Sequence, residues 1–402
     1  MNFRILILIF VLTSNFSFSA NAKDTLTGAM VSAYNTSGLL EQNRAVLRAA
    51  DEDVATAASQ LAPVVSWASS VSHSGSESSS YDTSGSVSLS ANYTLYDGGK
   101  SSLGLEAAKF SVLATRSKLV SIEQNVLFEA VTAYLGVIRE TENVSLRENN
   151  LSVIREELRA ANDRFEVGEI TKTDVALAEA RLAASNSALA VAKGSYEKAV
   201  ASYVSAIGEK PGSLEYPNFV PEVPNSLESA IAIALTEHPS IDELKNLIKV
   251  SEINSKIADL STGFTISLGS SVSLDEEGET SGSLSVSASG PIFSGGKLYS
   301  SSRKKIALKQ QTLARLYSSK ISIEQNVTNA FSSLKVAQAA KSAAEEQIRA
   351  SEVALTGVKE EAILGARTTL DVLNAEKDLL DARMQLISAK VDENLSLYRL
   401  LL

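Results

Sequence analysis

The sequence predicts a mainly α-helical chain with two β-hairpins. Three features carry that prediction: the spacing of the prolines, an internal repeat, and two serine-rich stretches of alternating hydropathy. The chain has 402 residues and only 7 prolines. None lies between residues 64 and 210 or after residue 291. Because proline breaks a helix interior at a cost of about 3 kcal/mol, both intervals can form very long helices.

The composition of residues 100–207 and 297–402 also favours helix, because Ala, Leu, Glu, Lys, Arg and Gln dominate there. Apolar residues recur at alternating steps of four and three, the spacing typical of coiled coils. The two apolar stripes are Leu127, Val131, Tyr134 and Ile138, and Ile323, Val327, Ala330 and Leu334. A helix from about Gly99 to about Asp163 would be ~100 Å long. No compact globular domain needs that length.

An internal repeat relates the two halves of the chain. The hexapeptide SIEQNV at 121–126 recurs letter for letter at 322–327, and YDGGK at 96–100 corresponds to FSGGK at 293–297. A glycine followed by Asp-Val and Ala-Glu also occurs once in each half. Three ordered matches at offsets near 200 indicate a duplicated series of elements.

The repeat predicts the organisation of the chain. We expect the first repeat at 23–207, a linker at 208–225 with four of the seven prolines, and the second repeat at 226–402. Each repeat should open with a shorter helix, at about 24–61 and about 226–260.

The stretches 64–96 and 264–293 are rich in serine, which is most often typical of flexible linkers. Here, however, apolar and small polar residues alternate with period two, as in strands whose two faces meet different environments. Polar turns expected at 74–83 and 275–282 would make each stretch one hairpin. This prediction puts His73 at the first turn.

A two-stranded hairpin cannot bury an apolar face alone. After residue 22 no apolar run approaches the ~20 residues of a membrane helix, so a membrane contact would have to use strands. The apolar faces would then meet lipid and the serine faces water. Because four strands cannot close a conducting barrel, several chains must contribute. The aromatic residues near the strand ends form either an interfacial girdle or a helix–strand junction core: Trp67, Tyr93, Tyr96 and Phe293.

Residues 1–22 are expected to be a removed secretory signal, with Arg4 before an apolar run and a small-x-small site ending at Ala22. A retained anchor is the alternative. The chain has no cysteine, which excludes disulfides, thiolate metal sites and a lipid anchor on a mature cysteine. The formal net charge of −10 disfavours nucleic acid as a partner, because phosphate contacts need clustered Lys and Arg.

Neither catalysis nor a bound cofactor is expected. His73 and His238 have no second histidine or carboxylate at ligand spacing, and His238 before Pro239 is interpreted as a helix-boundary residue. The two Gly-Gly-Lys sequences lack the rest of a phosphate-binding loop.

The hairpin exits LYDGGK at 95–100 and IFSGGK at 292–297 resemble those of the TolC-like outer-membrane efflux protein family, as do RFEVG at 164–168 and GARTTLDVL at 365–373. The resemblance covers essentially the whole mature chain. It implies a homotrimer whose hairpins form a twelve-stranded β-barrel in the outer membrane of a Gram-negative bacterium. The helices would continue the barrel as a tunnel through the periplasm, with the linker in a belt around its middle. A periplasmic adaptor and an inner-membrane pump would dock at the far tip, for efflux of small molecules or type I protein secretion.

Each long helix must reverse at that tip. Gly168 and Gly365 stand where a positive φ is useful. The returning helices can be capped by Thr171 or Thr173 and by Thr368 or Thr369.

By the resemblance, Thr173 and Asp174 on one turn and Arg367 on the other are the candidate latch that holds the tip shut. Asp371 would form an acidic ring that favours cations. The alternative is that Asp174 and Asp371 are ordinary N-terminal carboxylates stabilised by the helix dipole. The chain departs from the family pattern at Asn374, where a second aspartate is common, and at Ala362, where an aromatic residue is common.

Two rival functions stay open at this level. A periplasmic adaptor or coiled-coil scaffold would need one helical hairpin and a compact β-region. A surface adhesin with a coiled-coil stalk would not need paired turns at Gly168 and Gly365.

Overall fold

The computed structural model describes residues 25–76, 79–217 and 221–401. The expected signal sequence at 1–22 lies outside the described residues. The fold is mainly helical with one small β-sheet, as predicted. The elements of the first half are α1 (Leu26–Thr36), α2 (Gly38–Ser59), β1 (Val64–Ser76), β2 (Ser79–Tyr96), α3 (Lys100–Glu166) and α4 (Lys172–Ile207). Those of the second half are α5 (Leu227–Glu237), α6 (Pro239–Leu260), β3 (Thr265–Asp275), β4 (Thr280–Ser289), α7 (Lys297–Ile363) and α8 (Thr369–Arg399).

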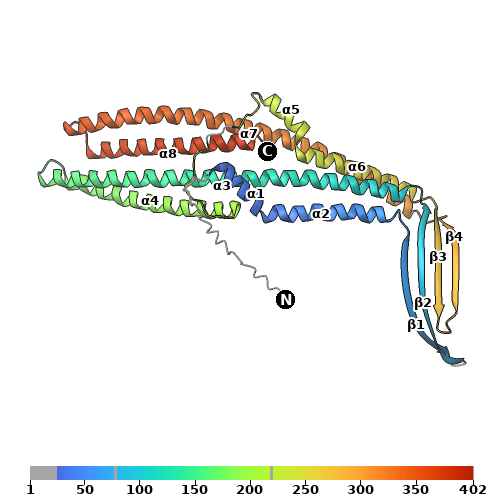
Figure 1. Ribbon diagram of the computed structural model, residues 1–402. Coiled ribbons are helices and arrows are strands. Elements are labelled where there is room, and N and C mark those ends of the chain that lie inside the picture. The colour runs from blue at the N-terminus through green and yellow to red at the C-terminus, as the bar shows by residue number, and fades with distance from the viewer. Residues whose placement is uncertain (1–24, 77–78, 218–220, 402) are drawn as a thin grey trace, which may run out of the picture.

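The molecule is a long bundle of helices with the sheet at one end and two helix reversals at the other (Figure 1). The helices α3 and α7 have 67 residues each, which corresponds to ~100 Å. On the sheet side, α2 packs on α3, α3 on α6 and α6 on α7. Towards the reversals, α3 pairs with α4, α7 pairs with α8, and α3 also packs on α8.

The opening helix of each half is broken, so the prediction of single helices at 24–61 and 226–260 was wrong. Ser37 ends α1 and caps α2, because its side-chain oxygen accepts a hydrogen bond from the Leu40 amide. His238 does the same for α6, with Nδ1 accepting from the Ser240 amide at 3.1 Å. Pro239 follows at the first position of α6, where its missing N–H costs nothing. The interpretation of His238 as a boundary residue is confirmed.

The four strands form one antiparallel sheet in the order β1-β2-β3-β4. The register keeps one face of the sheet mainly apolar and the other mainly serine, since Trp67 pairs with Leu89 and Ser66 with Ser90. Ala68 opposite Ser88 and Ser69 opposite Val87 are exceptions. The two predicted faces are therefore real. On the serine face, hydroxyl pairs join neighbouring strands at 2.7–3.0 Å: Ser66–Ser90, Ser70–Ser86, Ser72–Ser84, Ser271–Ser283 and Ser273–Ser281.

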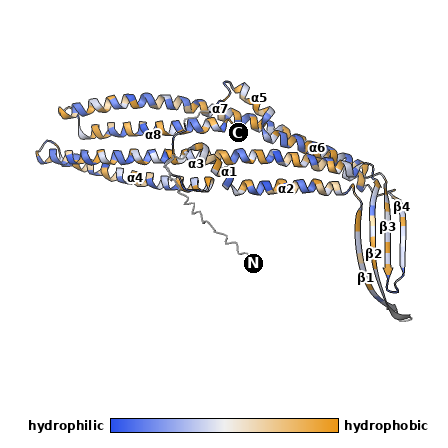
Figure 2. Cartoon of the chain, viewed as in Figure 1, coloured by the Kyte–Doolittle hydropathy of each residue, from blue (hydrophilic) through white to orange (hydrophobic). Residues whose placement is uncertain are grey.

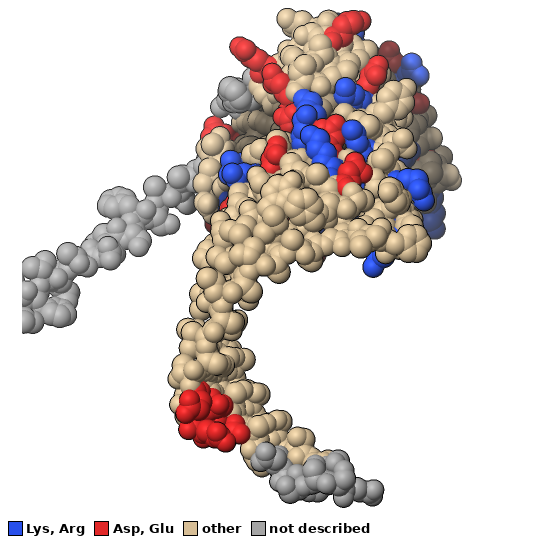
Figure 3. Space-filling view, turned by 90° about the vertical axis from the view of Figure 1, so that its right-hand side faces the viewer, with Lys and Arg blue, Asp and Glu red and all other residues tan. Residues whose placement is uncertain are grey.

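The predicted first turn was too wide. Strand pairing continues to a last pair, Ser76 with Ser79. His73 therefore lies within β1, with Nδ1 2.8 Å from the Thr83 hydroxyl oxygen. Seen from the sheet end, charged side chains crowd over the helices, while the strands carry an acidic group at the β3–β4 turn (Figure 3). That group comprises Asp275, Glu276, Glu277 and Glu279.

The main core lies midway along the bundle and joins both halves of the chain. Tyr134 on α3 and Tyr203 on α4 are almost fully buried there, with Leu26 of α1 and Val391 of α8 in the same cluster. Polar and apolar residues are mixed along the long helices (Figure 2). Within the described ranges, no helix is long and apolar enough to cross a membrane.

Candidate functional site

The two helix reversals are built alike. Gly168 after α3 has φ +78° and Gly365 after α7 has φ +75°, a conformation that only glycine adopts without strain. At the first turn, the Glu169 amide donates to the Arg164 carbonyl at 2.9 Å and the Gly168 amide to the Phe165 carbonyl at 3.0 Å. The second turn repeats both bonds. This double closure is the Schellman motif, which satisfies the last carbonyls of a helix.

The returning helices carry matching capping boxes. Thr171, and not Thr173, caps α4: its hydroxyl accepts from the Asp174 amide, and Asp174 Oδ2 accepts from the Thr171 amide at 2.9 Å. The hydroxyl also donates to Oδ2 at 2.7 Å, and this bond lowers the pKa of Asp174 below its ordinary value. Thr173 is exposed.

Thr368, and not Thr369, caps α8 in the same way. Asp371 Oδ2 accepts from the Thr368 amide at 2.9 Å and from its hydroxyl at 2.8 Å. These bonds, the amide bond first, lower the pKa of Asp371. Asp174 Oδ2 and Asp371 Oδ2 therefore cap the first turns of α4 and α8. This is the role of an ordinary helix N-terminal carboxylate, the alternative to a gate.

Arg367 is engaged within its own turn. Its Nε donates to Glu361 Oε2 at 2.7 Å, and this bond raises the pKa of the guanidinium. Among the described residues of one chain, no hydrogen bond or ion pair joins Arg367 to Thr173 or Asp174. A latch between these residues would therefore have to form between neighbouring chains.

One contact does join the two reversing hairpins near this end, and no sequence pattern predicts it. The Arg181 guanidinium on α4 donates to the side-chain oxygen of Asn374 on α8 at 2.7 Å. Beside it, Leu373 of α8 is buried in a cluster with Ile154 of α3 and Ala178 of α4. Ala362 is buried on α7. From the sequence alone, Asn374 is only a departure from the family pattern.

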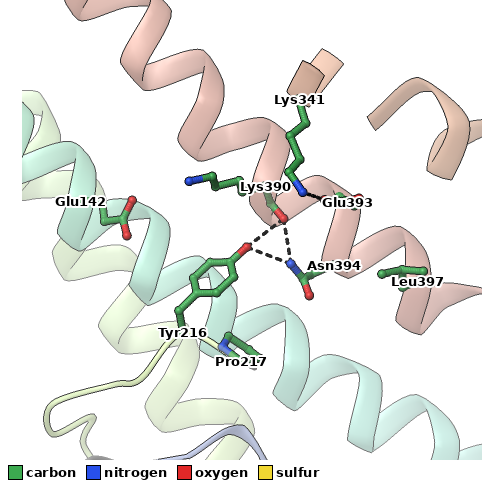
Figure 4. A pocket seen from close by; sticks show the side chains of 8 residues that line it. All are labelled: Glu142, Tyr216, Pro217, Lys341, Lys390, Glu393, Asn394 and Leu397. Atoms are coloured by element: carbon green, nitrogen blue, oxygen red, sulfur yellow. Dashed lines mark hydrogen bonds and ion pairs between the residues drawn. The ribbon is translucent and has the colours of Figure 1, made fainter. Parts of the chain in front are cut away.

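A second polar cluster fixes the segment after α4 to both halves of the bundle. The Tyr134 hydroxyl donates to the Glu215 carbonyl at 2.7 Å. The Tyr216 hydroxyl donates to the Lys390 carbonyl at 3.0 Å and accepts from Asn394 Nδ2 at 2.8 Å (Figure 4). Tyr216, Lys390 and Asn394 line a cavity of about 330 Å³, and burial raises the pKa of Tyr216.

The same cavity contains an ion pair between Lys341 of α7 and Glu393 of α8 at 2.8 Å (Figure 4). The hydrogen bond to Glu393 raises the pKa of Lys341. The described residues contain no group of three or more His, Cys, Asp or Glu that could hold a metal ion.

The family model for outer membrane efflux proteins matches residues 31–209 and 258–401. The chain belongs to the outer membrane efflux protein family. It is 35% identical over 390 residues to Outer membrane efflux protein BepC of Brucella suis, covering 95% of this chain and 85% of that protein. Alkaline protease secretion protein AprF of Pseudomonas aeruginosa is 25% identical over 306 residues, 70% of this chain and 61% of that protein.

Solved structures show the same fold. The outer membrane protein VceC of Vibrio cholerae gives a TM-score of 0.81 at 20% identity, over 93% of this chain and 94% of that one. The MtrE outer membrane channel of Neisseria gonorrhoeae in its open state gives 0.81 at 22% identity, over 93% and 87%.

This efflux protein is therefore an outer-membrane channel protein that extends into the periplasm, and its family is one of transport proteins rather than enzymes. The adaptor and adhesin interpretations fall away. In the single chain the aromatic residues at the sheet end are exposed: Trp67 to 75% and Phe293 to 89%. Tyr96 is also exposed, to 50%, but its ring packs on Phe264, with ring centroids 5.4 Å apart. Both the girdle and the junction core thus have residues suited to them.

Proposed function

We propose that three copies of this efflux protein, each without residues 1–22, assemble into one export duct across the outer membrane and periplasm. One observation supports the proposal most strongly: a four-stranded sheet that has an apolar face, a serine face and two outer strands, β1 and β4, each paired on one side only. Unpaired strand edges are unfavourable in lipid, and closure between copies removes them. Repeats at 23–207 and 226–402, joined by 208–225, would supply one hairpin each.

Assembly is tested by extracting the protein from membranes with detergent and comparing its electrophoretic migration with and without boiling. We expect a heat-labile trimer. A protein that leaves the membrane without detergent and migrates as a monomer under both conditions would refute the duct.

The helix reversals are the proposed gate at the periplasmic tip. Thr173 and Asp174 of one chain and Arg367 of a neighbour would form the latch, with Asp371 in a ring around the opening. Three copies of a weak exposed contact could hold the tip shut and still yield to a partner, because exposed ion pairs contribute only about 0–1 kcal/mol each. The contact between Arg181 and Asn374 would reinforce the closed arrangement within each chain.

The proposed partners are a periplasmic adaptor and an inner-membrane transporter that opens the tip. Two classes of cargo have support. The stronger similarity is to a protein named for efflux, which favours small molecules, and the weaker one is to a protein named for protease secretion. Deleting the gene and measuring dye and detergent sensitivity beside the secreted proteins separates them. If the deletion strain keeps both its resistance and its secreted proteins, the export assignment is wrong.

A further inference from the structure

The helices α2 and α7 are the outer members of the series on the sheet side of the bundle. The inner joint between the two halves of the chain is the contact of α3 with α6. In Figure 1, α2 lies along the free side of α3. Of all the residues of α2, only Leu40 is buried. One side of α2 and one side of α7 thus remain uncovered in the single chain.

The internal repeat identifies what those sides correspond to. Both α3 and α7 have 67 residues, so a residue of α7 carries the number of its α3 equivalent plus 197, as Lys297 does for Lys100. Both α2 and α6 have 22 residues, with an offset of 201, as Pro239 has from Gly38. An α7 that met α2 of a second copy would therefore reproduce the joint that α3 makes with α6.

The strand pairing fixes the register of the inner joint. Tyr96, just before α3, pairs with Ile266, just after α6, so the two helices have their sheet-side ends at one height. The helices are antiparallel, because α3 leads away from the sheet and α6 leads towards it. Counted from those ends, Ala107 is the eighth residue of α3 and Asn254 the seventh from the end of α6, so the two lie opposite each other. Eleven residues further from the sheet, Lys118 comes opposite Glu243, and the charge of Lys118 accordingly opposes the rise that burial gives the pKa of Glu243.

The equivalent positions on the outer helices differ in exposure. On the inner joint, Ala107 and Ala114 of α3 are buried, Ser111 is half-buried and Lys118, farthest from the sheet, is exposed. On α6, Glu243, Leu247, Val250 and Asn254 are half-buried. The equivalents on α7 and α2 are all exposed: Lys304, Leu308, Gln311 and Arg315, and Gln42, Val46, Ala49 and Asp53. Their spacing of four and three residues puts each set on one side of its helix.

The charges at these positions are complementary. Asp51, Glu52 and Asp53 form an acidic run on α2, and Arg303, Lys304 and Lys305 form a basic run on α7. The register of the inner joint brings the two runs to the same height, with Asp53 opposite Lys304 and Gln42 opposite Arg315.

We propose that α2 of one protomer packs against α7 of the next as a copy of the α3–α6 joint, with Asp53 and Lys304 paired across the interface. The contact extends the interface between the β1 and β4 edges of neighbouring copies into the helices, because α2 leads into β1 and β4 leads into α7. It rests on the proposed assembly and adds the neighbouring surfaces, their register and the ion pair. Opposite charges at one height also disfavour a slipped register, in which like charges would meet.

The chain has no cysteine, so introduced pairs report on this interface alone. In the full chain in its membrane, we would make D53C with K304C and Q42C with R315C, and the mismatched sets D53C with R315C and Q42C with K304C. A disulfide needs Cα atoms within about 7 Å, whereas eleven helical residues span ~16 Å. Oxidation should link the matched sets into covalent trimers and leave the mismatched sets unlinked.

The controls separate failure of the interface from failure of the duct. Each variant must first show the heat-labile oligomer of the parent protein. If that oligomer is present and the matched sets link no more than the mismatched ones, the inference is wrong while the duct stands. If the parent protein itself forms no heat-labile oligomer, both fail. As a second measurement, D53K and K304D should each lower the temperature at which the oligomer dissociates, and the double exchange should restore it; additive losses would contradict the pair.

Discussion

Arg181 on α4 donates a hydrogen bond of 2.7 Å to the side-chain oxygen of Asn374 on α8, and this contact ties the first reversing hairpin to the second. The two residues lie 193 positions apart in sequence. Their contact lies beyond the capping boxes, where Leu373 is buried against α3 and α4. It is therefore a polar bond at the edge of a packed cluster, placed where the proposed gate must open.

We expect R181A to raise the open probability of the channel in planar lipid bilayers. An exposed contact of this kind contributes at most about 1 kcal/mol, so the shift should reach about fivefold. R159A is the matched control, because Arg159 is an exposed arginine whose ion pair with Glu156 stays within α3. An open probability of R181A equal to that of the parent protein would remove Arg181 from the gate.

Asp371 is expected to set ion preference. D371N removes the carboxylate charge but keeps a side-chain oxygen that can accept from Thr368, so the cap of α8 survives. The reversal potential under a salt gradient should shift towards lower cation preference. D378N, further along α8, is the control. An unchanged reversal potential in D371N would leave the capping role as the whole role of Asp371.

The turns should loosen in acid. The pKa values of Asp174 and Asp371 are lowered from the ordinary 3.8, so their contribution to folded stability is present in full above that value. It is lost as the pH falls through the lowered folded pKa values. Amide hydrogen exchange at residues 168–174 and 365–371, extrapolated to a common intrinsic rate, should accelerate below about pH 4. Protection that stays constant down to pH 2 would contradict the capping account.

Tyr216 should stabilise the middle of the bundle. Y216F keeps the ring but leaves the Lys390 carbonyl and Asn394 without the hydroxyl. We expect the free energy of unfolding to fall by about 1–2 kcal/mol. Y196F is the control, since Tyr196 lies on α4 with its side chain exposed to 37%. Similar losses in the two variants would mean that the hydroxyl bonds of Tyr216 contribute nothing specific.

The two faces of the sheet should differ in chemical access. Ser88 and Leu89 are neighbours on β2, and their register partners put them on the serine face and the apolar face. In intact outer membranes, S88C should react with a charged, water-soluble thiol reagent and L89C should not. Equal labelling of both would show that the apolar face is not covered by lipid.

Much of this fold follows from local pattern. Period-two alternation indicated which residues share a face of the sheet, because side chains of a strand alternate. It failed at Ser74–Ser76, where both faces are polar and pairing continues through backbone bonds that no alternation reports. The breaks at Ser37 and His238 were missed because one capping side chain decides them.

The repeat correctly predicts the order of the helices and strands, but not which residues of α3 and α7 are equivalent. The SIEQNV hexapeptides are offset by 201 positions, whereas the helices that contain them are offset by 197, from Lys100 to Lys297. Identical letters therefore stand about one helical turn apart in equivalent helices. Contacts such as Arg181 with Asn374, or Tyr216 with Asn394, depend on packing between distant segments, and no local pattern contains them.

The proposed duct should conduct ions. Single-channel recording of the purified, unboiled oligomer in a planar lipid bilayer tests it most directly. We expect discrete conductance steps that disappear when the sample is boiled before addition, because heating separates the chains that close the barrel. A heat-labile oligomer that inserts and gives no conductance, in the parent protein and in R181A alike, would contradict it.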